Sequence, residues 1–133
     1  MELEFIGEAE GILVSYDQDN EWLYADWYGP HTPGSAAVAC QLMLNILAKR
    51  PCAKVLNDNT NITNSSAEIT DSGWQWMKDM YEAGVRCFAW VQPSAAMDQQ
   101  ISESALRPST RVFVATFSDM ASAYSWLERQ AVN

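Results

Sequence analysis

Residues 11–28 read GILVSYDQDNEWLYADWY, and this stretch sets how the fold begins. Apolar and polar residues alternate over 11–17 and again over 21–28, with the polar cluster DQDN at 17–20 between them. Two alternating runs joined by a short polar turn predict an antiparallel β-hairpin. Residues 2–7 are an additional candidate for a short edge strand, which we do not count among the predicted strands.

Beyond the hairpin, segments with helical spacing alternate with segments typical of strands. Helices are expected over 35–49, from 70 or 71 to about 83, from 94 toward Pro108, and from 118 onward. Strands are expected over 54–58, 86–91 and 111–117, and the polar stretch 59–70 is expected to be a loop. The sequence therefore predicts an α/β fold in a single domain, residues 1–133. The expected fold is an antiparallel hairpin followed by (βα) units, giving a mixed five-stranded sheet packed with four helices.

Charge and length narrow the classes of function. The 133 residues carry a net charge of −9, from 17 acidic and 8 basic residues. A surface of this sign repels phosphate groups, so binding to nucleic acid or to an anionic membrane is not expected. No apolar run reaches the roughly 18–20 residues of a membrane-spanning helix, and the acidic start lacks the features of a signal peptide. We expect a cytoplasmic protein that does not insert into membranes.

No set of residues predicts a catalytic, cofactor or metal site. The three cysteines, Cys40, Cys52 and Cys87, have no CxxC spacing and are expected to be buried, reduced thiols rather than zinc ligands or a disulfide. His31, the single histidine, lies in a Pro/Gly loop and is expected to be exposed and without a functional role. No Gly-x-Ser-x-Gly, GxGxxG or P-loop motif is present. We therefore do not expect an enzyme, and His31 or Asp58 would have to carry any activity.

Asp58 lies at the carboxyl end of the strand 54–58. In open α/β sheets, ligands tend to bind beyond the carboxyl ends of the strands. Two alternatives remain beside a ligand contact. Asp58 could form hydrogen bonds with backbone N–H groups of the residues that follow it, or it could join Asp17 and Asp19 in a metal cluster.

The six tryptophans are the main sign of a binding role. Trp90 lies in an apolar strand and is expected in the core. Trp22 and Trp27 point to opposite faces of one strand, and Trp74 and Trp76 to different sides of one helix. At least one of each pair is therefore expected at the surface, in a pocket or in a subunit contact. Large aromatic residues are enriched in interfaces and ligand clefts. The candidate ligand or partner contacts are Trp22, Trp27, Asp58, Trp74 and Trp76.

An ordered set of short motifs gives a resemblance over nearly the whole chain from about residue 11. The matching residues are Trp22, Trp27, Gly29, Leu56-Asn57-Asp58, Trp76, Gly84-Val85, Ala89–Val91, Phe117-Ser118-Asp119, Ala123 and Trp126-Leu127. With these residues the chain resembles STAS-like domains, the fold of bacterial anti-sigma-factor antagonists. It is closest to small stand-alone bacterial relatives of unassigned function.

The resemblance implies a candidate phosphorylation site at Ser72. In the antagonists, a serine at the start of the second helix is phosphorylated, within a motif such as Asp-Ser-Ser-Gly. The corresponding residues here are Asp71-Ser72-Gly73, which lack one serine and follow a longer loop. The alternative is that Thr70, Asp71 and Ser72 only cap the helix.

These observations predict a non-catalytic regulatory or protein-interaction module without a cofactor. The alternative is a carrier of a small apolar ligand or lipid, with an aromatic-lined pocket. The helix 35–49 has only a narrow polar stripe, Gln41, Asn45 and Lys49, so most of it should be covered, either by the sheet or by a second subunit. A homodimer is also expected.

Overall fold

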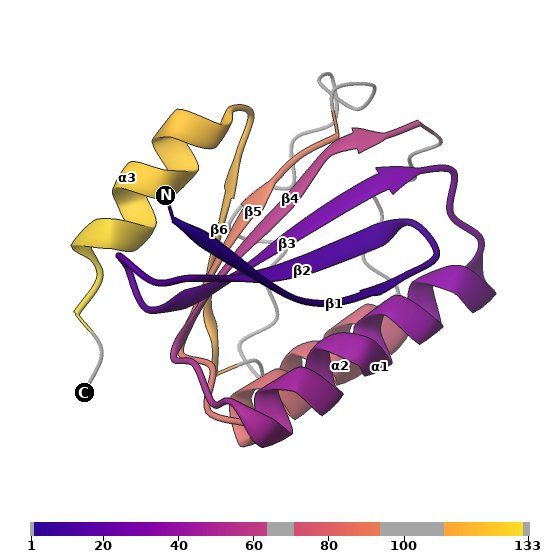
Figure 1. Cartoon of the computed structure of the whole chain (residues 1–133), viewed down its shortest axis with the longest axis horizontal. Helices are drawn as coiled ribbons and strands as arrows, with labels where there is room; N and C mark the ends of the chain where they lie inside the picture. The colour runs from indigo at the N-terminus through magenta and orange to yellow at the C-terminus, as the bar shows by residue number, and fades with distance from the viewer. Residues whose placement is uncertain (1, 64–70, 94–110, 132–133) are drawn as a thin grey trace.

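The computed structural model describes residues 2–63, 71–93 and 111–131. The strands are β1 (Leu3–Ala9), β2 (Ile12–Asp17), β3 (Trp22–Gly29), β4 (Lys54–Ile62), β5 (Cys87–Val91) and β6 (Phe113–Phe117). The helices are α1 (Pro33–Lys49), α2 (Asp71–Glu82) and α3 (Met120–Arg129). These elements form an α/β fold around one mixed sheet, as predicted (Figure 1).

The six strands lie in the sheet in chain order, β1-β2-β3-β4-β5-β6. β1, β2 and β3 are antiparallel neighbours, whereas β3–β4, β4–β5 and β5–β6 are parallel pairs. The predicted antiparallel hairpin followed by parallel strands is thus confirmed. β1 and β6 are the two ends of this order.

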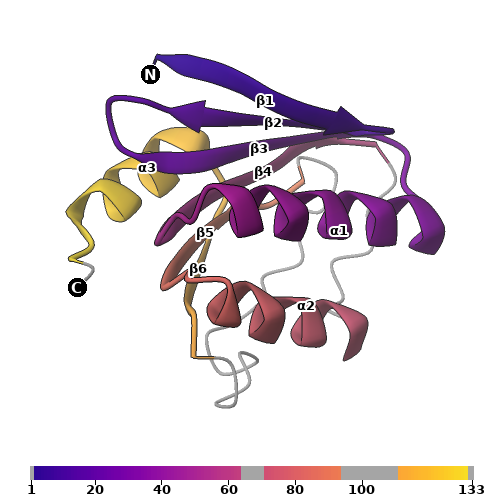
Figure 2. The same cartoon turned by 60° about the horizontal axis from the view of Figure 1, so that its bottom comes forward.

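The described helices divide between the two faces of the sheet. α1 and α2 lie side by side on one face, and α3 lies on the other (Figures 1 and 2). The larger apolar core lies under α1 and α2, and a smaller one lies under α3, which contacts β4, β5 and β6. Because both faces are partly covered, alternate residues of one strand enter different cores.

Two predictions about the strands are wrong. The described residues form six strands rather than five, because residues 3–9 form a full strand paired with β2. In addition, β4 continues through residues 59–62, which were expected to belong to a loop. Asn61 and Ile62 pair with Tyr28 and Gly29, so backbone pairing to β3 outweighs the low strand propensity of this Asn-rich stretch.

The ends of the helices agree well with the capping residues in the sequence. Thr32 caps α1 and forms a capping box with Ser35, which was expected to be the cap itself. Asp119 caps α3 by accepting hydrogen bonds from the backbone and side chain of Ser122. Gly84 follows α2 with a φ of +113°, a conformation that favours glycine at a helix end.

The predicted helix from residue 94 toward Pro108 lies outside the described residues. Three of the four predicted helices are therefore present in the described part of the chain. No helix in that part is long and apolar enough to cross a membrane.

Candidate functional site

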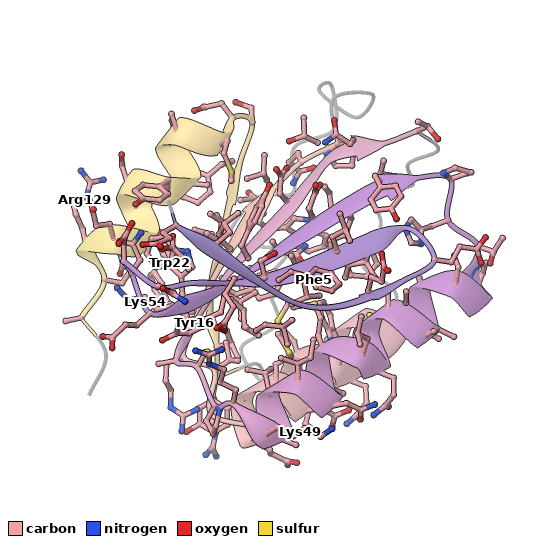
Figure 3. The ribbon with its side chains drawn as sticks, viewed as in Figure 1. Phe5, Tyr16, Trp22, Lys49, Lys54 and Arg129 are labelled. Atoms are coloured by element: carbon pink, nitrogen blue, oxygen red, sulfur yellow. The ribbon has the colours of Figure 1, made fainter. Side chains whose placement is uncertain are left out.

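Trp22 is fully buried at the start of β3, on the face that α3 covers. Its ring packs edge-on against Tyr124 of α3, with 5.2 Å between the ring centroids. The Lys54 ammonium group lies 5.8 Å from the Trp22 ring and donates a hydrogen bond to the Leu127 carbonyl (Figure 3). Trp22 is therefore a core residue that anchors α3 to the sheet.

Trp27 is also buried, but under α1 and α2 on the other face. Its indole N–H donates a hydrogen bond of 2.7 Å to Oδ1 of Asn57, which is buried as well. The prediction that one of this pair lies at the surface, in a pocket or in a subunit contact is wrong, because Trp22 and Trp27 pack in the two cores of the sheet. The two rings do point to opposite faces, but helices cover both faces at these positions.

Aromatic rings form a continuous chain under α2. Trp76 packs edge-on against both Trp27 and Phe88, and Phe88 packs edge-on against Trp90. Trp76 is half-buried, and so is Trp90, which was expected in the core. The buried indole N–H groups of Trp76 and Trp90 have no acceptor among the described residues.

The candidates at the start of α2 remain untested. Ser72 and Trp74 lie in the first turn of this helix, and their side chains are outside the described part of the structure.

Asp58 is 6% exposed and lies at the centre of a small polar cluster. The Tyr24 hydroxyl donates to Asp58 Oδ2 at 2.9 Å, and the Thr60 backbone N–H donates to Asp58 Oδ1 at 3.0 Å. The expected bond to a following backbone N–H group is thus confirmed. Asp17 pairs with Trp22 at the start of β3, whereas Asp58 pairs with Asp26 on the same strand. Trp22 and Asp26 are four residues apart, about 13 Å along the strand. Asp17 and Asp58 are therefore too far apart to form a joint metal cluster.

Asp26 stands opposite Asp58 on the neighbouring parallel strand. Burial and the nearby charge of Asp58 raise the pKa of Asp26, and a hydrogen bond with Asn61 partly offsets this. Burial, with the charge and hydrogen bond of Asp58, also raises the pKa of Tyr24. Asp26 Oδ1 is buried without a hydrogen-bond partner in the described structure. The Asp26 carboxylate is therefore less well stabilised by hydrogen bonds than the Asp58 carboxylate.

His31 is half-buried rather than exposed, so the expectation from its loop position is wrong. Its Nδ1 lies 3.0 Å from Ser35 Oγ, and its Nε2 lies 3.0 Å from the Gly11 carbonyl oxygen. The ring also packs against Trp27. These contacts join the loop before α1 to the opening hairpin, which is a structural role.

The three cysteines are free thiols. Cys52 and Cys87 are buried and Cys40 is half-buried, which agrees with the prediction of reduced, covered thiols. Burial raises the pKa of all three, that of Cys40 to about 12. The neutral thiol is therefore the dominant form at neutral pH, and these side chains are poor nucleophiles.

The other half of the α3 side of the sheet has no described helix over it. α3 contacts β4, β5 and β6 and covers Trp22 at the start of β3. Strands β1 and β2 and the rest of β3 have no described helix over this side. Register and strand alternation place these residues on one surface, which we call the open half-face: Leu3, Phe5, Leu13, Tyr24, Asp26 and Tyr28. Leu3 is 42% exposed, Phe5 58% and Tyr28 39%, and the other three are half-buried.

The open half-face was not among the sites predicted from the sequence. The alternation of Leu3 and Phe5 with glutamates was a usable signal, and it had already suggested an edge strand at 2–7. The side of the sheet left open depends on where α3 packs, and no local pattern specifies that position.

Comparison with known proteins gives no family for this chain. No protein-family model matches the sequence, and neither a curated protein nor a solved structure matches it. The resemblance to STAS-like domains therefore stays a prediction.

Proposed function

We propose that this chain is a non-catalytic interaction module that binds a protein partner through the open half-face. The observation that carries the proposal is the exposure of Leu3, Phe5 and Tyr28 on one side of the opening strands. The exposed parts of these side chains contribute nothing to folding while they stay in water. Apolar residues gathered on one exposed surface instead mark a site of contact with another molecule.

The polar residues of the same surface support this assignment. Tyr24 and Asp26 lie beside the exposed residues and supply a hydroxyl and a carboxylate group within the surface. Aromatic side chains surrounded by polar groups are characteristic of protein interfaces. The net charge of −9 favours a partner that is not itself strongly acidic.

The resemblance to STAS-like domains supports the regulatory part of the proposal. Anti-sigma-factor antagonists act by binding other proteins, and the order of an antiparallel hairpin followed by parallel strands is compatible with that fold. A phosphate group on Ser72 would be the regulatory input in this scheme. A second copy of the chain is the alternative occupant of the open half-face.

Site-specific photo-cross-linking in the cells of origin tests the proposal. A photoreactive phenylalanine analogue replaces Phe5 in one variant and Val38 in a control, since Val38 is 60% exposed on α1 and lies away from the open half-face. We expect a discrete adduct at position 5 and none at position 38. We also expect Tyr28→Ser, which changes the same surface, to reduce the adduct at position 5.

The mass of the adduct identifies the class of partner. An adduct at twice the mass of the chain indicates a homodimer, and any other discrete mass indicates a different protein. Equal labelling at positions 5 and 38, or an adduct at position 5 that Tyr28→Ser leaves unchanged, contradicts the proposal.

The aromatic chain under α2 favours a second candidate function, a carrier of a small apolar ligand. Trp76 and Trp90 offer two buried N–H donors that lack acceptors among the described residues. A ligand with an apolar body and an acceptor atom would match them. Native mass spectrometry of protein from its own host is the test. A non-covalent adduct that Trp76→Phe weakens supports the carrier, and a bare mass argues against it.

A further inference from the structure

The outer edge of β1 has unpaired backbone groups. β1 is the end strand of the sheet and pairs only with β2, so no described residue forms hydrogen bonds with its other edge. An edge strand presents alternate N–H and C=O groups, which can pair with a further strand. β1 has seven residues, an ordinary strand length that is sufficient for such pairing.

The side chains of β1 give this edge a definite chemical pattern. Leu3 and Phe5 point to the open half-face, and Glu4 points to the other side, where it contacts Arg50. Further glutamates stand at positions 2, 8 and 10. All four glutamates are exposed. The register shift between Phe5 and Gly7 turns Glu8 to the same side as Leu3 and Phe5, since Glu8 pairs with Leu13. The edge therefore combines two exposed apolar side chains with negative charges on both sides of the strand.

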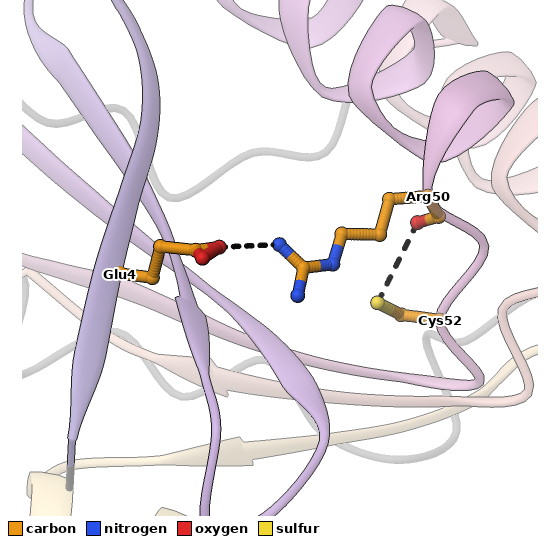
Figure 4. A network of polar contacts seen from close by, with 3 residues as sticks. All are labelled: Glu4, Arg50 and Cys52. Atoms are coloured by element: carbon orange, nitrogen blue, oxygen red, sulfur yellow. Dashed lines mark hydrogen bonds and ion pairs between the residues drawn. The ribbon is translucent and has the colours of Figure 1, made fainter.

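Glu4 already binds a guanidinium group. Arg50 Nη1 lies 2.6 Å from Glu4 Oε2 (Figure 4). The Arg50 guanidinium also stacks on the Tyr16 ring. No described residue forms an ion pair with Glu2, Glu8 or Glu10. These three carboxylates are available to cationic groups of a partner.

The same charges disfavour pairing with a second copy through this edge. Two β1 strands paired antiparallel around Leu3 would bring Glu2 of one copy opposite Glu4 of the other. Like charges opposite one another destabilise strand pairing. Each copy also carries a net charge of −9.

We propose that the β1 edge binds an extended peptide segment in which lysine or arginine alternates with apolar residues, as a seventh strand of the sheet. The backbone of the segment pairs with β1, and its apolar residues extend the surface of Leu3 and Phe5. Its basic residues meet Glu2 and Glu4 on the other side of the strand. Affinity comes from the backbone hydrogen bonds, and charge selects the segment. This inference rests on the proposed interaction function and names the partner chemistry for it.

A defined peptide tests the inference. The probe is a capped, fluorescently labelled peptide in which arginine and valine alternate. It has about eight residues, which is a common strand length. One control peptide has glutamate in place of arginine. A second keeps the arginines but carries N-methyl groups on alternate residues, which removes the N–H donors from one edge. Binding is measured by fluorescence anisotropy at an ionic strength of about 0.15 M.

We expect the arginine peptide to bind, and both control peptides to bind at least about tenfold more weakly. Phe5→Ser and Glu2→Gln should each weaken binding of the arginine peptide, whereas Val38→Ser should not change it. Amide hydrogen exchange in β1 should slow when the peptide is bound. Equal binding of the N-methylated peptide, which indicates attraction by charge alone, overturns the inference, and so does the absence of binding.

The outcomes separate this inference from the function on which it rests. A cross-link at position 5 without peptide binding leaves the open half-face as an interface and removes strand addition. The absence of both results removes both proposals.

Discussion

Asp26 and Asp58 stand opposite one another on β3 and β4 in different surroundings. Asp58 accepts hydrogen bonds at both carboxylate oxygens, whereas Asp26 has one buried oxygen without a described partner. Burial and the charge of Asp58 raise the pKa of Asp26. The folded protein therefore binds the Asp26 proton more tightly than the unfolded chain. The free energy of unfolding consequently falls as pH rises from the usual aspartate range through the raised pKa of Asp26.

We predict that Asp26→Asn stabilises the protein at neutral pH. The variant removes a poorly compensated charge next to Asp58, so the free energy of unfolding should increase by about 1 kcal/mol or less. The gain should shrink as pH approaches about 4, where aspartate side chains become protonated. Urea unfolding of both proteins at the two pH values measures this. A loss of stability at neutral pH would show that the Asp26 carboxylate is needed for folding.

The matched variant Asp58→Asn should have the opposite effect. Tyr24 and the Thr60 backbone N–H donate to different carboxylate oxygens, and an amide keeps only one of these two oxygens. One buried donor loses its acceptor, which costs about 1–3 kcal/mol of unfolding free energy. The same urea titrations give this value, and a neutral or stabilising result would contradict the role assigned to Asp58.

Single residues were predicted unevenly from the sequence. The local hydrogen bond of Asp58 could be predicted, because it involves residues two apart in the chain. The burial of Trp22 and Trp27 could not, because it depends on Tyr124 and Asn57, which are distant in the sequence. Strand alternation correctly placed the two rings on opposite faces.

Helix α3 and strand β1 make different contributions to the fold. Leu127 of α3 is fully buried, and Phe5 of β1 is 58% exposed. We predict that Leu127→Ala lowers the free energy of unfolding by about 2–5 kcal/mol, since it leaves a cavity in the core under α3. Phe5→Ser should change it by no more than about 0.5 kcal/mol. Urea unfolding curves compare the two variants. A large loss for Phe5→Ser would mean that Phe5 serves folding rather than binding.

Elements with strong periodicity or clear end signals were predicted best. α1, α2, α3 and β5 lie close to their predicted ranges, since capping residues, Gly84 and a continuous apolar run specify them locally. β1 was not counted among the predicted strands, and β4 was predicted to end too early. Pairing with β2 and β3, rather than their own composition, makes these segments strands.

The distribution of helices over the whole sheet determines which surface is free to bind. α1 and α2 cover one face, while α3 covers only the parallel half of the other (Figure 2). The α/β class and the order of the described elements could be inferred from the chain. The open half-face could not, because it follows from the packing of α3 on β4, β5 and β6.

Accessibility of the open half-face inside cells tests the central claim most directly. Phe5→Cys and the control Val38→Cys place thiols at positions of nearly equal exposure, 58% and 60%. The native cysteines should give little background, because burial raises the pKa of each thiol. A membrane-permeable maleimide is applied to living cells and to the purified variants, and labelling rates are compared.

We predict that Cys at position 5 reacts rapidly in the purified protein and at least about tenfold more slowly in cells, where a partner covers it. Cys at position 38 should react at the same rate in both. Equal rates for position 5 in cells and in the purified protein would contradict the claim that the open half-face is a binding surface.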